Sequence, residues 1–360
     1  VYRCGSTWFI TSYDGVRFAQ KNPDLFSSAK AFDGVANAIR MIPLAIDPPK
    51  HADYRRVLDP MFGPKRMEAM DADLRAQLRG HIDAFAPSGR CDVVADLSYK
   101  FPTQAILTLF GLPLEHLPQF LEWTYGIIKD REVGSLDAET ASPRVIECSI
   151  ALFGFLAEQL EIKRSHPGED MLSSILALDG DEAWSDEEIL GLCFLIVLAG
   201  LDTVTGAIGY SMLNLATNPE LRQRLIADQS LIAPFVEEVL RLDGPVPGVP
   251  RRTTQDVEVE GVLIPADSPV LLMLGTANRE VPSVAAAPNE MNLNAKPTHL
   301  GFGGGIHRCL GSHLARRELR LTVEEFHARI PEYRLAGEAH TLWPAGTLGL
   351  EALPLEFEPC

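Results

Sequence analysis

The stretch Phe302-Gly-Gly-Gly-Ile-His-Arg-Cys-Leu-Gly311 places one cysteine, Cys309, between glycines and directly before a helical pattern. The first amides of a helix and its dipole stabilise a thiolate. Glycines let the backbone approach a flat group closely, and amides aimed at the sulfur would tune the potential of a bound iron. A lone cysteine is more often a small buried hydrophobe. A phosphate loop is a poorer interpretation, because Ile306 interrupts the G-x-G-x-x-G spacing.

Phe302, Gly305, His307, Cys309 and Gly311 together match the haem-binding signature F-x-x-G-x-H-x-C-x-G of the cytochrome P450 family, which this chain resembles. Further motifs follow in the family's order: Asp47-Pro-Pro-Lys-His51, Ala199-Gly-Leu-Asp202-Thr203, Glu238-Val-Leu-Arg241, and Arg251 ahead of Asp256. The resemblance spans nearly the whole chain. It implies the fold of the soluble bacterial-type members, mainly α with small β-sheets and a long central helix over haem.

That long helix is also visible in the residues themselves. Ser185-Asp-Glu-Glu188 is a capping box, and an apolar stripe from Ile189 continues until Asn218-Pro219 stops it. About thirty residues at ~1.5 Å each would cross a whole domain.

Local patterns predict the other elements. We expect a strand at Thr7–Tyr13, a helix that starts from Asp47 with Pro48 and Pro49 in its first turn, and helices over 66–86, 92–110, 114–128 and 144–164. We also expect a hairpin of Val257–Val259 with Val270–Leu274, an irregular stretch over 280–301, and a last helix over Leu310–Arg329.

The resemblance implies haem b (iron protoporphyrin IX) as cofactor, with Cys309 as the metal ligand. A haem carries two propionates, so it needs cationic and hydrogen-bonding groups from distant parts of the sequence. The family's positions for this task are His51, Arg55, Arg251 and His307. Singly, each of these is more often a solvated surface residue. His51 and Arg55 are four residues apart and share one helix face.

Asp202 and Thr203 lie in the middle of the long helix, directly after Gly200 and Leu201. By itself an Asp-Thr pair there predicts a helix kink or a satisfied polar pair. The family implies catalysis instead: Thr203 holds dioxygen and its water, and Asp202 conveys protons for O–O cleavage.

Glu238 and Arg241 are one helical turn apart, and the resemblance makes them a buried pair that is usually joined by an arginine from the loop before the cysteine. This chain has Glu290 where that arginine is expected. Either another arginine, such as Arg279, replaces it, or the loop is looser and holds haem less well.

The segments that the family places around its substrate pocket are apolar here, which favours a lipophilic substrate, whether terpenoid, steroid, fatty or aromatic. They are the early loop (Ile39, Met41, Ile42, Leu44), the long helix (Leu195, Leu198, Ala199) and the turn after Arg241 (Val246, Val249). Arg40 is either a partner for a substrate carboxylate or a solvated loop residue.

Composition excludes several classes of protein. The 360 residues carry 49 acidic and 32 basic side chains, a formal charge of −17, which argues against a general nucleic-acid binder. The six scattered cysteines suit a reducing compartment, so we expect a cytoplasmic protein. The longest apolar stretch, Ile189–Leu201, is too short to span a membrane. No linker divides the chain, so we expect one domain over 1–360, with an N-terminus open to extension before Val1.

Electrons for oxygen chemistry must come from separate proteins, since the sequence contains no flavin or nicotinamide module. The expected partners are a ferredoxin and its reductase, with O₂ and the substrate as small molecules. Basic residues gather on the family's cysteine-side face, and Arg66, Arg316 and Arg317 are the predicted docking charges for an acidic ferredoxin. Two alternatives remain: a haem-binding sensor or carrier without turnover, which would not need Asp202 and Thr203, and a peroxygenase or isomerase on the same fold.

Overall fold

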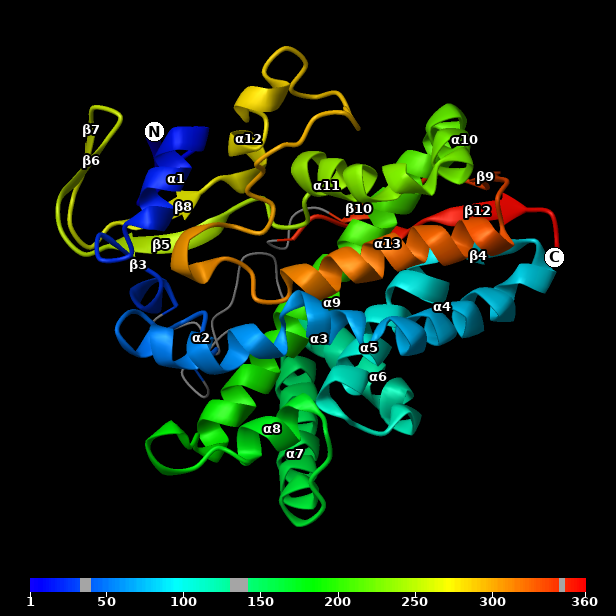
Figure 1. The fold of residues 1–360 in the computed structure, drawn as a ribbon. Helices are drawn as coiled ribbons and strands as arrows, with labels where there is room; N and C mark the ends of the chain where they lie inside the picture. Colours follow the sequence, from blue (N-terminus) through cyan, green and yellow to red (C-terminus); the bar gives the residue numbers. More distant parts are fainter. Residues whose placement is uncertain (33–39, 130–141, 343–346) are drawn as a thin grey trace.

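The computed structural model describes residues 1–32, 40–129, 142–342 and 347–360. Helices dominate, and small sheets lie at two edges of the molecule (Figure 1). The helices are α1 Tyr13–Lys21, α2 Lys50–Met61, α3 Pro64–Glu68, α4 Asp71–Phe85, α5 Lys100–Phe110, α6 Leu117–Lys129, α7 Pro143–Ser165, α8 Met171–Leu176, α9 Asp186–Thr217, α10 Pro219–Ala227, α11 Ile232–Leu242, α12 Leu274–Ala277 and α13 Ser312–Arg329. The predicted class, mainly α with small β-sheets, is confirmed.

Helix α9 begins where its capping box predicts. The Ser185 hydroxyl accepts a hydrogen bond from the Glu188 amide, and the Glu188 carboxylate accepts one from the Ser185 amide. By length and composition alone this helix could cross a membrane, but 56% of its most apolar window is buried inside the protein. Its apolar character is therefore explained by its place in the core, where α5, α7 and α13 pack against it.

Two predicted helices are broken in the structure. The run over 66–86 divides into α3 and α4 at Ala69-Met70, and the run over 92–110 begins as strand β4 Arg90–Asp92, followed by a π-type segment, Val94–Ser98, before α5. Periodicity alone did not reveal these breaks, because apolar residues continue at helical spacing on both sides of each one.

One strand pairing in the structure differs from the predicted one. The five-stranded sheet has the order β1-β2-β8-β5-β3, with β1 Tyr2–Cys4, β2 Thr7–Ile10, β3 Phe26–Ser27, β5 Val249–Thr253 and β8 Pro269–Leu272. The predicted hairpin of Val257–Val259 with Val270–Leu274 is wrong, because β6 Val257–Val259 pairs with β7 Val262–Ile264. The turn between them has positive φ at Glu260 and Gly261, the geometry of a tight two-residue hairpin. β8 instead joins β2 and β5.

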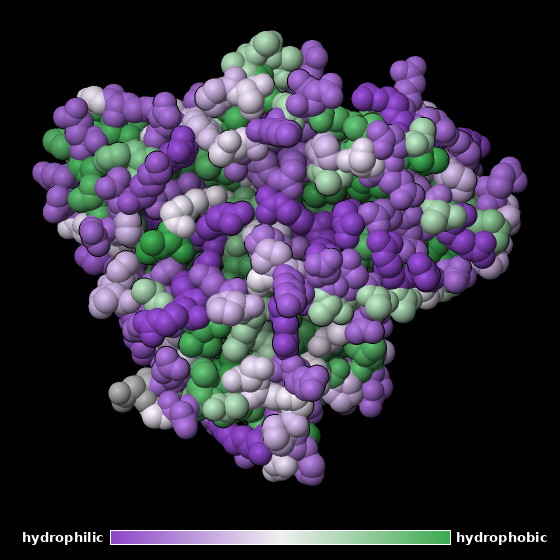
Figure 2. Space-filling model, in the orientation of Figure 1, coloured by the Kyte–Doolittle hydropathy of each residue, from purple (hydrophilic) through white to green (hydrophobic). Residues whose placement is uncertain are grey.

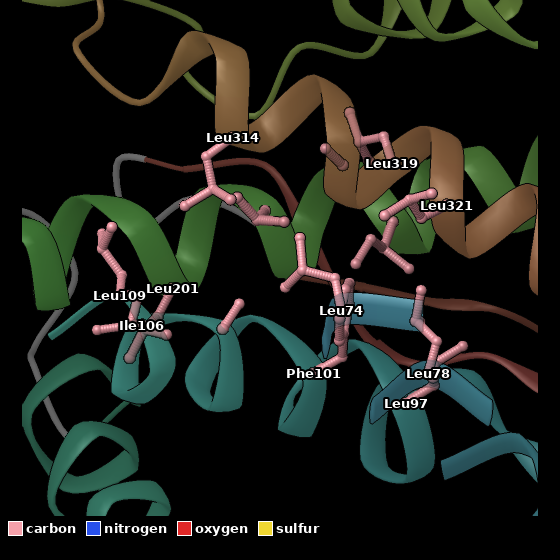
Figure 3. Close-up of a cluster of buried hydrophobic side chains, with 14 of the residues drawn as sticks. Leu74, Leu78, Leu97, Phe101, Ile106, Leu109, Leu201, Leu314, Leu319 and Leu321 are labelled. Carbon is pink, nitrogen blue, oxygen red and sulfur yellow. The ribbon is translucent and has the colours of Figure 1, made fainter. Parts of the chain in front are cut away.

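Two smaller sheets lie near the C-terminus, and the main core fills the space between the long helices. One sheet has the order β4-β12-β9, and the other pairs β10 with β11; their strands are β9 Tyr333–Leu335, β10 His340–Leu342, β11 Gly349–Ala352 and β12 Pro354–Phe357. Figure 3 shows leucine, isoleucine and phenylalanine side chains from α4, α5, α9 and α13 meeting in one cluster. This packing fixes α9 against α13, and so fixes the distance between the two segments that carry Thr203 and Cys309.

Candidate active site

A cavity of about 340 Å³ lies between α9, the loop before α13 and the turn after α11. Six of the seven predicted site residues line it: His51, Arg55, Thr203, Arg251, His307 and Cys309. They come from four segments that are far apart in the sequence, so the fold brings them together. Asp202, the seventh, lies beside this cavity and not in its lining.

The loop that carries Cys309 is held in a tight conformation. The Cys309 amide donates a hydrogen bond of 2.9 Å to the carbonyl of Phe302. Gly303 and Gly305 have φ angles of 66° and 64°, which L side chains rarely adopt. A Cβ on Gly305 would lie 1.9 Å from the carbonyl oxygen of Gln20 in α1. Glycine is therefore required at this position because α1 packs against the loop, a contact that sequence reasoning missed.

Cys309 lines the cavity and is accessible from it. Protein surrounds the residue on its other sides. Burial raises the pKa of this thiol, while the Gly311 amide and the arginines Arg55, Arg308 and Arg316 favour the thiolate and oppose the rise. A positively charged metal ion at the sulfur would complete the stabilisation of a thiolate.

Near Cys309, the cavity wall holds buried nitrogen donors that lack an anionic partner. The rings of His51 and His307 lie 4.4 Å apart, and the Nε2 atom of each has no hydrogen-bond partner in the part of the chain that the structure describes. Burial, with Arg251 and His51 nearby, lowers the pKa of His307 to about 3. Burial likewise lowers the pKa of Arg251 to about 10.

Such a cluster is costly unless something negative binds there. Arg55 adds a further cation, held by Asp59 at 2.7 Å and by the carbonyl of Arg308 at 2.8 Å. Together these donors fit a ligand with two carboxylates lying next to Cys309, which is the arrangement that a haem requires.

On α9, Thr203 and Asp202 face different surroundings. The Thr203 hydroxyl donates to the carbonyl of Ala199 at 2.6 Å, and both residues line the cavity. Asp202 accepts a hydrogen bond from the hydroxyl of Thr347, which precedes β11. Burial raises the pKa of Tyr99, and the nearby charge of Asp202 raises it further. Thr203 thus lines the cavity, whereas Asp202 lies outside its lining and contacts Thr347.

The missing arginine near Glu238 and Arg241 is replaced by backbone. Both side chains are fully buried and form a bidentate ion pair of 2.7 and 2.8 Å. Arg241 also donates to the carbonyls of Pro288 and Glu290, and the amide of Asn292 donates to Glu238 at 2.8 Å. Arg279 does not replace the missing arginine, because it bonds to the carbonyls of Gly275 and Leu242. The loop instead contacts Arg241 and Glu238 through three hydrogen bonds, and weaker haem retention stays a prediction.

Two of the three predicted docking charges form ion pairs within the protein, and their role in docking stays a prediction. Arg316 forms a bidentate pair with Glu237 and lies over the ring of Phe302. Arg317 is bidentate to Asp71. The third residue, Arg66, is exposed and donates to a backbone carbonyl. The sequence could not show these pairs, because α13 meets the carboxylates only in the folded chain.

The predicted apolar lining is partly correct. Leu44, Leu195, Ala199, Val246 and Val249 line the cavity. Met41 and Leu198 pack instead in a neighbouring cluster around Phe194, Ile42 packs against Ile46 and Tyr54, and Ile39 lies outside the described residues. Arg40 lines a second pocket with Lys50 and Glu188, away from Thr203 and Cys309.

Comparison with known proteins identifies the family. A family model described as Cytochrome P450 matches residues 155–326. Vitamin D(3) 25-hydroxylase of Pseudonocardia autotrophica is 32% identical over 370 residues, covering 99% of this chain and 89% of that protein. The methyl-branched lipid omega-hydroxylase of Mycobacterium tuberculosis is 32% identical, with 97% and 84% covered. The chain therefore belongs to the cytochrome P450 family.

Solved structures agree in fold. The structure of CYP109E1 from Bacillus megaterium in complex with corticosterone matches with a TM-score of 0.87 and 28% identity, covering 98% of this chain and 92% of that one. The chain is accordingly a cytochrome P450 monooxygenase, and haem is the cofactor that this family implies.

Proposed function

We propose that this protein uses haem b, O₂ and two electrons from a ferredoxin and its reductase to hydroxylate a lipophilic small molecule. The observation that carries the proposal is the composition of one cavity. Cys309 and a set of buried, unpaired nitrogen donors lie in it, Thr203 reaches it from α9, and the rest of its lining is mainly apolar.

In this proposal Cys309 would bind the haem iron, and His51, Arg55, Arg251 and His307 would hold the two propionates. The haem, when bound, supplies the iron at which dioxygen is activated, and a thiolate ligand favours O–O cleavage. Propionates would also stabilise the charged forms of Arg251 and His307, whose pKa values burial lowers. Haem loss should therefore lower the stability of the folded protein, because these buried groups lose their anionic partners.

We propose that Thr203 and Asp202 transfer protons into the cavity. The Thr203 hydroxyl already donates to Ala199, so its oxygen remains free to accept from water in the cavity. In this proposal Asp202, which precedes Thr203 in the sequence and lies outside the cavity lining, passes protons toward Thr203.

The apolar lining supports a lipophilic substrate. Leucine, valine and alanine side chains from α9 and from the turn after α11 would hold such a compound by burial of apolar surface and would exclude water. The relatives named above act on vitamin D(3) and on methyl-branched lipids, and a structural neighbour was solved with corticosterone. The common property of these compounds is low polarity.

The test is a binding screen followed by turnover. Haem-loaded protein is titrated with steroids, branched fatty acids and terpenoids, and with polar compounds of matched size, while the haem spin state is followed. Lipophilic compounds should displace the iron-bound water at micromolar concentration. Those that bind are then turned over with a ferredoxin, its reductase and ¹⁸O₂, and one labelled atom should enter the product. Binding of polar compounds alone would contradict the proposed substrate class, and reduction by a flavodoxin but by no ferredoxin would contradict the proposed partner.

A further inference from the structure

Two adjacent faces of α9 serve different purposes. Ala199, Thr203 and Ala207 follow one another at intervals of four residues and all line the cavity. Asp202 and Gly206, also four residues apart, share the neighbouring face. There α9 meets the segment Thr347–Ala352, which includes β11 and lies along the helix.

This segment is docked closely against both α9 and the cavity wall. A Cβ on Gly206 would lie 2.5 Å from the carbonyl oxygen of Leu348, so only glycine permits the contact. The amide of Leu348 donates to the carbonyl of Pro245 at 2.6 Å, and Pro245 itself lines the cavity. Backbone contacts on two sides therefore fix Leu348, and with it the preceding residue.

That residue is Thr347, whose hydroxyl donates to the Asp202 carboxylate. We propose that Thr347 is a positioning residue for Asp202: it holds the carboxylate in one orientation behind Thr203, so that protons reach the cavity by a defined route. The inference rests on the proposed proton role of Asp202. An Asp side chain has two rotatable bonds, and a charge-assisted hydrogen bond from a fixed donor restricts them both.

The experiment compares Thr347→Val, which is close to isosteric but cannot donate, with Thr347→Ser, which keeps the hydroxyl. Thr341→Val is the matched control, because Thr341 is exposed on β10, which pairs with β11. In haem-loaded protein with a ferredoxin, its reductase and a turned-over substrate, Thr347→Val should lower product formed per NADH by about tenfold, the loss expected for one charge-assisted hydrogen bond. Thr347→Ser should restore most of it, and Thr341→Val should match the unmodified protein.

Further readouts separate positioning from a purely structural effect. The spectral dissociation constant of the substrate and hydrogen exchange in residues 347–355 should be unchanged in Thr347→Val. In Gly206→Ala, which displaces the segment, exchange should rise and coupling should fall. The double variant Asp202→Asn with Thr347→Val should be no worse than Asp202→Asn alone.

The outcomes distinguish this inference from the function on which it rests. Full coupling in Asp202→Asn would remove the proton role itself. Uncoupling in Asp202→Asn with full coupling in Thr347→Val would overturn the inference alone. Failure of Thr347→Ser to rescue, or additive losses in the double variant, would also overturn it.

Discussion

Arg316 lies over the ring of Phe302, with its guanidinium carbon 4.4 Å from the ring centroid. The same guanidinium donates to both oxygens of Glu237, at 2.6 and 2.8 Å, and Glu237 also contacts Nε2 of His299 at 2.9 Å. Since the carbonyl of Phe302 accepts from the Cys309 amide, this series of contacts connects α11 and α13 to the cysteine loop. Arg316 therefore links the cysteine loop, through Phe302, to Glu237 on α11.

Replacing Arg316 by Gln should loosen the cysteine loop. We expect a loss of about 1–3 kcal/mol in the free energy of unfolding, since charge-assisted hydrogen bonds are removed, together with faster loss of haem to a scavenger protein. Arg317→Gln is the control, because Arg317 pairs with Asp71 and not with Glu237. It should lower stability without speeding haem loss. Equal rates of haem loss in both variants would show that Arg316 is only another ion-paired residue.

The Glu237 pair should also be visible in the pH dependence of stability. Burial alone would raise the pKa of Glu237, but hydrogen bonds from Arg316 and His299 outweigh it and lower that pKa to about 2. A lowered folded-state pKa contributes stability above the ordinary value of ~4.3, and this contribution disappears as the pH falls toward 2. Glu237→Gln should thus be less stable than the unmodified protein at pH 7, with the gap closing below pH 4. Urea unfolding at several pH values measures the gap, and a gap that is constant with pH would contradict the assignment.

Cys309→Ser should abolish the thiolate-type absorption of the reduced CO complex, because an alcohol oxygen cannot supply the same electron donation to iron. Cys193→Ser is a suitable control, since Cys193 is a fully buried cysteine of α9. It should keep the thiolate-type spectrum even where stability falls. A thiolate-type spectrum in Cys309→Ser would show that another residue is the ligand.

Thr203→Ala should leave haem and substrate binding nearly intact while most reducing equivalents are lost as peroxide. Thr217→Ala offers a close comparison, because the Thr217 hydroxyl also bonds to the carbonyl four residues earlier on α9, at 2.7 Å, but lies far along the helix. Product and peroxide formed per NADH are the measurements. The control should remain coupled, and a coupled Thr203→Ala protein would show that Thr203 has only a helical role.

Docking of an acidic ferredoxin is better tested by changing basic residues for which the described residues provide no ion-pair partner. The cysteine-side face, shown in Figure 2, is largely hydrophilic, and Lys65, Arg66 and Arg308 are exposed in its segments. Reversing these three to Glu should slow the first-electron reduction several-fold and flatten its dependence on salt, since steering acts over a Debye length of ~10 Å at 0.1 M. Because the Arg308 charge also favours the Cys309 thiolate, Lys65→Glu with Arg66→Glu is measured beside the triple variant, and in this double variant the CO spectrum should be unchanged.

Arg224→Glu reverses an exposed charge on α10, outside the segments that carry Lys65, Arg66 and Arg308, and should have little effect on that reduction rate. If the triple variant and Arg224→Glu show the same rate and salt slope, the ferredoxin docks elsewhere.

The sequence by itself determined the elements whose signals are local. The capping box at Ser185 and the helix stop at Asn218-Pro219 set the limits of α9 because caps depend on residues a few positions apart. The signature around Cys309 identified the family because the loop needs glycine at positions of positive φ and close approach. The gathering of His51, Arg55, Arg251 and His307 was predicted only through the family's spacings, and the cavity contains all four.

Only the tertiary structure decided the contacts between distant segments. Nothing local to Glu238 indicates that the Asn292 amide would replace an arginine, and nothing near Asp202 indicates a donor at Thr347. Arg316 looks like a docking charge in the sequence and supports the cysteine loop in the fold. A side chain's charge is local, but its partner is chosen by packing, because ion pairs and hydrogen bonds require donors and acceptors within about 3 Å. Only the folded backbone brings residues so far apart in the chain to that distance.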